Sequence, residues 1–155
     1  MGVVAVDSSG TFEEPPIWIV AVRKVQVQKH KAFCLSEVDC LRYREGHEKN
    51  WRERVSAALI FTSLDNLVKE TDIIQIDKDF LGWRERYIER NLKRLFGLKY
   101  SGKSLLSNPI IQFIPAKFCP PVKEAHNKTQ WARHKNKNMQ VKECPNLADI
   151  IELLE

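Results

Sequence analysis

The fold class is decided near the start of the chain, by the segment Val3-Val4-Ala5-Val6-Asp7-Ser8-Ser9-Gly10. Its apolar residues predict a short strand, and the polar residues after them predict a turn. Ile17–Val22 is apolar on both faces, which is typical of a central strand. A third short strand is expected around Lys31–Leu35, so these three segments predict an antiparallel meander.

The pattern then changes to helices that alternate with single strands. Helices are expected over Lys49–Glu70, about Phe80–Phe96, about Val122–Lys135 and from near Asn146, and strands over Ile73–Ile76 and Ile110–Ile114. Gly97 suits the C-terminal cap of the second helix. Strand–helix–strand units require parallel strands with right-handed crossovers. The sequence therefore predicts an α/β fold with a mixed five-stranded sheet, in which two parallel strands join the meander and helices flank the sheet.

Composition limits the function only broadly. The 155 residues are 43% hydrophobic and 29% charged, as in a soluble globular protein, and no linker divides 1–155 into two domains. No stretch approaches the roughly 20 apolar residues of a membrane span, and no secretory signal is recognisable, so we expect a cytoplasmic protein with reduced cysteines. The net charge of +5 favours an anionic partner, with nucleic acid as the main candidate.

Two acidic residues directly follow two of the predicted strands. Asp7 comes after the first strand, and Asp77 comes after Ile73–Ile76. If these strands are parallel neighbours, their ends bring the two carboxylates together, and a divalent cation such as Mg²⁺ or Mn²⁺ would offset the repulsion. Ordinary structural roles are the alternative: Asp7 can begin a type I turn, and Asp77 or Asp79 can cap a helix.

Two helices offer further acidic candidates. Glu53 shares a ridge with apolar residues of the first long helix, so it would lie at the top of the side that faces the sheet. Glu48, one turn earlier, is nearly as well placed, and an exposed Glu stabilised by the helix dipole is the alternative for either. Asp149 lies at the start of the last helix, where it also fits a capping box with Asn146.

Acidic residues at these four positions on a β-β-β-α-β-α-β-α chain resemble the ribonuclease H-like superfamily. The opening Val6-Asp7-Ser8-Ser9-Gly10-Thr11-Phe12 is similar to that of uncharacterised families that begin with strand-D-E-S-G. The late segment Leu147-Ala148-Asp149-Ile150-Ile151 resembles the closing L-A-D-[IL]-I segment of those families. The chain departs from their pattern at Ser8, where a Glu is usual, and no distinctive motif flanks the helix Glu.

The resemblance implies a nuclease or phosphodiesterase that acts on RNA, DNA or a hybrid with two Mg²⁺ or Mn²⁺ ions. Asp7 and Asp77 would share the ions, and Glu53 and Asp149 would each complete one coordination shell. The alternatives are a catalytically inactive nucleic-acid-binding module and a protein-interaction module, both with the same fold.

Basic side chains provide candidate contacts to nucleic acid. Arg86, Arg90 and Arg94 recur on one side of the second helix, although a solvated face balanced by nearby Glu residues is the alternative. The late segment adds further candidates: Lys117, Lys128, Arg133 and Lys135. His126 or His134 is a candidate to transfer protons or to contact the scissile phosphate, because histidine titrates near neutrality; an exposed histidine without such a role is the alternative.

Overall fold

The computed structural model describes residues 2–9, 17–23, 29–35, 51–78, 85–102, 104–115, 121–123, 125–127, 141–143 and 147–154. The strands are β1 (Val3–Ser9), β2 (Ile17–Arg23), β3 (Lys29–Leu35), β4 (Ile73–Asp77), β5 (Ile110–Ile114) and β6 (Val141–Glu143). The helices are α2 (Trp51–Leu64), α4 (Glu85–Lys99), the 3-10 turn η2 (Leu105–Ser107) and α6 (Leu147–Glu152). Residues 121–123 and 125–127 are also helical. None of the described helices has the length and apolar character needed to cross a membrane.

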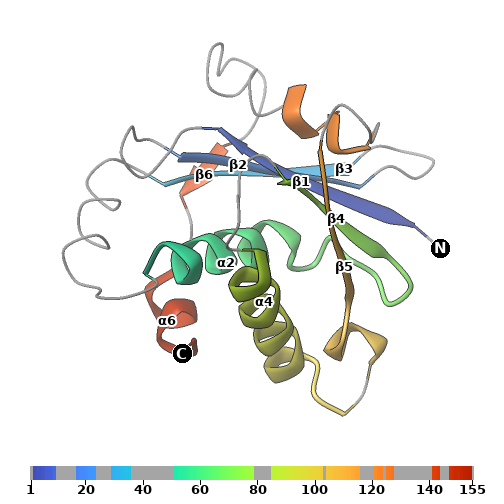
Figure 1. The fold of residues 1–155 in the computed structure, drawn as a ribbon, viewed down its shortest axis with the longest axis vertical. Coiled ribbons are helices and arrows are strands. Elements are labelled where there is room, and N and C mark those ends of the chain that lie inside the picture. Colours follow the sequence, from blue (N-terminus) through green and yellow to red (C-terminus); the bar gives the residue numbers. More distant parts are fainter. Residues whose placement is uncertain are drawn as a thin grey trace.

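The strands form a mixed sheet in the order β5-β4-β1-β2-β3-β6 (Figure 1). β1, β2 and β3 form an antiparallel meander, and β4 and β5 run parallel to β1. The α/β class with a mixed sheet flanked by helices is thereby confirmed. The predicted number of five strands is wrong, because β6 adds a sixth, parallel to β3. The sequence missed β6 because three residues with one apolar side chain carry no periodic pattern.

Two helix ends differ from the prediction. α2 ends at Leu64 and does not continue to Glu70, because Asn66 adopts a left-handed backbone with φ 64° and the N–H of Leu67 bonds back to the Leu64 carbonyl. Asparagine is one of the few residues that accept this conformation after a helix. α4 continues to Lys99, so Gly97 lies within the helix and does not cap it.

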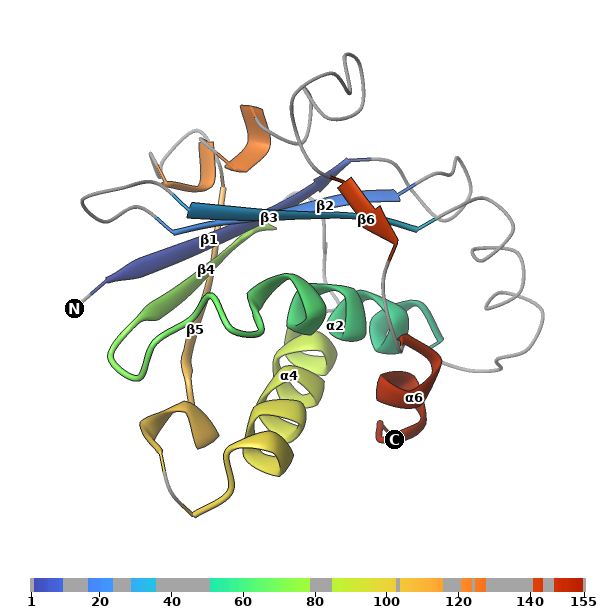
Figure 2. The ribbon, with the colours of Figure 1, turned by 180° about the vertical axis from the view of Figure 1, so that it is seen from behind.

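Different elements cover the two faces of the sheet. The larger core lies under α2, α4 and α6 and takes alternate residues of three strands: Val4, Val6, Ile19, Ala21, Ile74 and Ile76. A smaller cluster lies on the other face: Ala5, Val20, Val22, Val122 and Ala125. Figure 1 and Figure 2 show the three helices on one side of the sheet and the orange helical residues near 121–127 on the other. Strand alternation thus gives each face its own packing partner.

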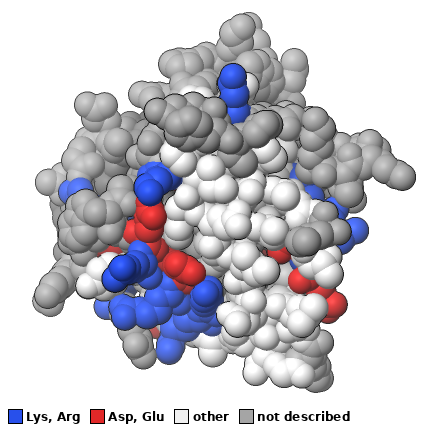
Figure 3. Space-filling view, turned by 45° about the vertical axis from the view of Figure 1, so that its right-hand side comes forward, with Lys and Arg blue, Asp and Glu red and all other residues white. Residues whose placement is uncertain are grey.

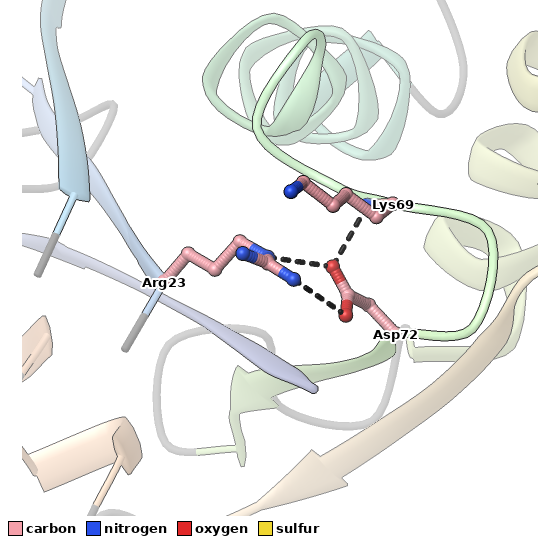
Figure 4. Close-up of polar contacts among 3 residues, drawn as sticks. All are labelled: Arg23, Lys69 and Asp72. Carbon is pink, nitrogen blue, oxygen red and sulfur yellow. Dashed lines mark hydrogen bonds and ion pairs between the residues drawn. The ribbon is translucent and has the colours of Figure 1, made fainter. Parts of the chain in front are cut away.

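A buried ion pair joins β2 to the turn before β4 (Figure 4). Arg23 donates from Nε to Asp72 Oδ2 at 2.9 Å and from Nη2 to Oδ1 at 3.3 Å. The backbone N–H of Lys69 donates to the same Oδ2 at 2.7 Å. Burial raises the pKa of Asp72, but these hydrogen bonds and one from the Gly2 backbone outweigh it, so the pKa lies below its ordinary value. A Cβ on Gly2 would lie 2.4 Å from Asp72 Oδ1, which explains the glycine there.

Asp65 joins the C-terminal ends of α2 and α4, since it accepts hydrogen bonds from Lys99 Nζ and Tyr100 Oη. Burial and the bond to Asp65 raise the pKa of Tyr100 from 10.0 to about 12.

We expect an ultraviolet titration to show one tyrosine that ionises at this high pH. Asp65→Asn removes the negative charge and should lower that midpoint. A midpoint that Asp65→Asn leaves unchanged would show that burial alone sets the pKa.

Candidate metal site at the ends of β1 and β4

Asp7 and Asp77 lie side by side near the carboxyl ends of two neighbouring strands. β1 and β4 are parallel and Val6 pairs with Ile76, so the next residue of each strand carries a carboxylate. Both side chains fall on the face that Ala5 occupies, because Val6 and Ile76 belong to the opposite core. Only 2% of Asp7 and 4% of Asp77 is exposed. The strand ends therefore hold two buried acidic side chains next to each other.

His126 completes the group from the helical segment that packs on this face. Val122 and Ala125 of that segment are fully buried in the cluster that contains Ala5. This packing places His126 at β1, with its Nδ1 atom 3.0 Å from Asp7 Oδ2. The histidine side chain is 43% exposed, against 2% for that of Asp7. The imidazole thus forms the rim of the site, and the carboxylates form its floor.

The three side chains fit one divalent metal ion. One donor atom from each of Asp7, Asp77 and His126 lies within 4.8 Å of the other two. Ligand atoms lie about 2.0–2.6 Å from Mg²⁺ or Ca²⁺, so two ligands of one ion are separated by at most about twice that distance. A cation between the two buried carboxylates would also remove their mutual repulsion. Carboxylate oxygens suit Mg²⁺ and Mn²⁺, and an imidazole nitrogen adds a preference for transition metals.

Within the described part of the chain, neither Glu53 nor Asp149 belongs to this group. Glu53 is only 5% exposed, in agreement with its inward ridge, but α2 packs on the face of the sheet opposite to Asp7. Asp149 is exposed on α6. The structure therefore does not bring the four predicted carboxylates together, because helical periodicity identifies the buried side of a helix but not the sheet face that it covers. Glu48 lies outside the described residues.

The contact between His126 and Asp7 adds metal binding to the roles that the histidine can take. The sequence predicted for His126 a role in proton transfer or in contact with the scissile phosphate, and not as a metal ligand. A usable signal was present: Val122 and Ala125 are three residues apart, which marks the side of a helix that packs on the sheet. His126, the next residue after Ala125, is then held close to the strand ends.

The predicted nucleic-acid-binding residues of α4 differ in their surroundings. Arg86 and Arg90 are exposed, and the Arg90 guanidinium lies 5.2 Å from the centroid of the Tyr87 ring. Arg94 donates from Nε to the Leu153 carbonyl at 2.8 Å, which joins it to the end of the chain after α6. Figure 3 shows basic groups interspersed with acidic ones on one side of the face that it presents. The remaining basic candidates lie outside the described residues: Lys117, Lys128, Arg133, His134 and Lys135.

The fold and the site together define an α/β protein with a candidate metal site at the carboxyl ends of two parallel strands. Comparisons with protein-family models, with curated proteins and with solved structures found no match for this chain. The functional assignment therefore rests on the geometry and chemistry of the site.

Proposed function

We propose that the protein is a metal-dependent hydrolase of phosphodiester bonds in nucleic acid, with the ribonuclease H-like fold that its motifs resemble. One observation carries the proposal: two buried carboxylates and an imidazole converge within 4.8 Å at Asp7, Asp77 and His126. The meander β1–β3, with β4 and β5 parallel to β1, agrees with the sheet that the resemblance implies. Strand ends of this kind are also where α/β proteins commonly bind ligands.

The three side chains have separate tasks. Asp7 and Asp77 supply the negative charge that binds the cation, and the pairing of β1 with β4 fixes their separation. His126, at the exposed rim, supplies a third donor or takes a proton from the attacking water. The bound Mg²⁺ or Mn²⁺ would supply the positive charge that polarises the phosphate and lowers the pKa of water.

The number of donors favours one bound ion. The two-ion mechanism that the resemblance implies needs further ligands, and Glu53 and Asp149 are not part of the described group. Equilibrium dialysis against Mn²⁺, followed by elemental analysis, measures the ratio of metal to protein. One ion per chain agrees with the three-residue site, and two ions per chain would favour the four-carboxylate arrangement.

A polyanionic substrate agrees with the charge of the protein. The net charge is +5, and Arg86 and Arg90 are exposed on α4. The same arginines also favour the alternative function, a non-catalytic nucleic-acid-binding module. Nucleic-acid binding that survives chelation, without turnover under any metal condition, would select that alternative.

Hydrolysis of a mixed pool of RNA, DNA and hybrid tests the proposal. We expect the wild type to cleave part of the pool with Mn²⁺ or Mg²⁺ and to stop when a chelator is added. Asp77→Asn keeps the shape of a ligand and removes its charge, so it should lose the activity. Cleavage by Asp77→Asn at the wild-type rate would refute the proposed site.

The role of His126 can be separated by its effect on metal affinity. We expect His126→Ala to weaken Mn²⁺ binding at least about tenfold and to weaken Mg²⁺ binding less, because the imidazole nitrogen favours transition metals. Titration calorimetry measures both affinities, and Glu152→Gln, at an exposed position of α6, is the control. If Mn²⁺ affinity is unchanged while turnover is lost, His126 transfers protons and is not a ligand.

A further inference from the structure

Gln75 and Gln112 form a side-chain pair on the same face of the sheet as the metal site. In the parallel pairing of β4 with β5, Gln75 lies beside Gln112 and Asp77 lies beside Ile114. Gln75 Nε2 donates to Gln112 Oε1 at 3.2 Å. Since side chains alternate along a strand, Gln75 and Asp77 point to the same side, about 6.6 Å apart along β4.

The side chains on this face are arranged in rows. The first row contains Asp7 and Asp77, with Ile114 beside Asp77 on β5, and the second contains the glutamine pair, with Ala5 beside Gln75 on β1. Ile73 and Ile110, which also pair, form the third. Gln112 is exposed and Ile110 is 59% exposed, so solvent reaches the outer end of both rows. Along β4, the side chains on this face thus change from acidic at Asp77 to neutral polar at Gln75 to aliphatic at Ile73, in two steps of about 6.6 Å each.

This order of groups matches one nucleotide that extends from the metal site along β4. A phosphate would lie at the cation, polar sugar or base edges would lie over the amides, and the apolar face of a base would lie over Ile73 and Ile110. Primary amides carry both donors and an acceptor, so they suit base edges and sugar hydroxyls. They carry no charge, so they add no general attraction for the phosphate backbone.

We propose that Gln75 and Gln112 bind the nucleotide next to the reacting phosphate, and that the substrate strand is unpaired at this point. The inference rests on the proposed function, which places a phosphate at Asp7 and Asp77. An unpaired strand is required because a base can turn its edge to the amides and its face to aliphatic side chains only when it is not held in a duplex.

The test uses a double variant that carries both Gln75→Met and Gln112→Met. Its kcat/KM is compared with that of the wild type on two substrates. Methionine keeps the length of the side chain and removes its amide donors and acceptor. One substrate is a single-stranded oligonucleotide, and the other is bis(p-nitrophenyl) phosphate, which has a phosphodiester but no nucleoside. We expect kcat/KM to fall about tenfold for the oligonucleotide, from the loss of two hydrogen bonds, and to stay unchanged for the small diester. Thermal unfolding verifies that the variant is folded.

A binding measurement makes the inference independent of turnover. Fluorescence anisotropy of a labelled oligonucleotide with Ca²⁺ in place of Mn²⁺, which keeps an oxygen-binding cation available to the carboxylates, should show an affinity loss of about tenfold in the double variant, equal at every salt concentration. By contrast, Arg86→Ala removes an exposed positive charge and leaves both amides in place, so its effect on affinity should change with the salt concentration.

Several outcomes would overturn the inference. The first is that the wild type and the double variant have equal oligonucleotide affinity and equal kcat/KM. The second is that the double variant loses kcat/KM equally on both substrates. The third is that the wild type does not bind unpaired strands. If the double variant lost as much affinity for a duplex as for the single strand, the claim that the substrate strand is unpaired would be refuted. A wild type that binds but hydrolyses neither substrate would refute the proposed function, and the binding result would still decide the role of the glutamines.

Discussion

Asp7→Asn is expected to reduce metal-dependent hydrolysis by roughly 10²–10³-fold, the range typical for loss of one electrostatic group from an active site. The substitution keeps the size of the side chain and removes its charge. Asp7 is 2% exposed and lies next to both Asp77 and His126, so water cannot readily replace the lost interaction. Initial cleavage rates at saturating Mn²⁺ measure the effect. Mn²⁺ should also no longer raise the melting temperature of the variant, because a ligand stabilises only the state that binds it.

Asp149→Asn is the matched control for Asp7→Asn. It makes the same chemical change at an exposed position of α6, outside the group formed by Asp7, Asp77 and His126. We expect its cleavage rate to stay close to that of the wild type. A loss as large as that of Asp7→Asn would contradict the three-residue site and favour the arrangement with four carboxylates.

Asp72→Asn is expected to lower the free energy of unfolding by about 3–5 kcal/mol near neutral pH, because it leaves a buried guanidinium without its counter-charge. The side chains of Arg23 and Asp72 are only 8% and 0% exposed. Urea unfolding measures the loss. Asp65→Asn is the control. The side chain of Asp65 is 22% exposed and that of its partner Lys99 is 40% exposed, so this ion pair should contribute about 1 kcal/mol or less to the free energy of unfolding. Equal losses in the two variants would contradict the role of burial.

The stability that Asp72 contributes should also depend on pH. Burial raises its pKa, but the hydrogen bonds from Arg23, Lys69 and Gly2 outweigh it, and the folded-state pKa lies below the ordinary value of 3.8. The contribution is therefore fully present above that ordinary value and is lost as the pH falls through the folded-state pKa. The difference in unfolding free energy between wild type and Asp72→Asn should be constant near neutrality and shrink in acid. A difference that grows in acid would contradict the ion pair.

The sequence predicted the part of the candidate site that depends on strands, which is the close approach of Asp7 and Asp77. Asp7 and Asp77 each follow a run of apolar residues, and the parallel pairing of β1 with β4 brings them together as strand ends predict. The meander and the two parallel strands follow from the same local patterns. Strand alternation then fixes the face on which both carboxylates lie.

The helical part of the site depends on packing that local patterns do not contain. The ridge of α2 correctly placed Glu53 inward, but nothing in the ridge identifies which face of the sheet it covers. Asp149 matched a family motif, and the structure leaves it exposed. His126 reaches Asp7 only because Val122 and Ala125 pack on the face of the sheet opposite to the one that α2 covers. These are tertiary contacts, and they decide which candidates meet.

X-ray diffraction from crystals soaked in Mn²⁺, with data at the manganese absorption edge, is the most direct test of the central claim. A single anomalous peak is expected within about 2.0–2.6 Å of the carboxylates of Asp7 and Asp77, a range of cation–oxygen distances common in proteins, with the His126 ring beside it. A manganese peak at another position, or two peaks bridged by Glu53 or Asp149, would contradict the three-residue site.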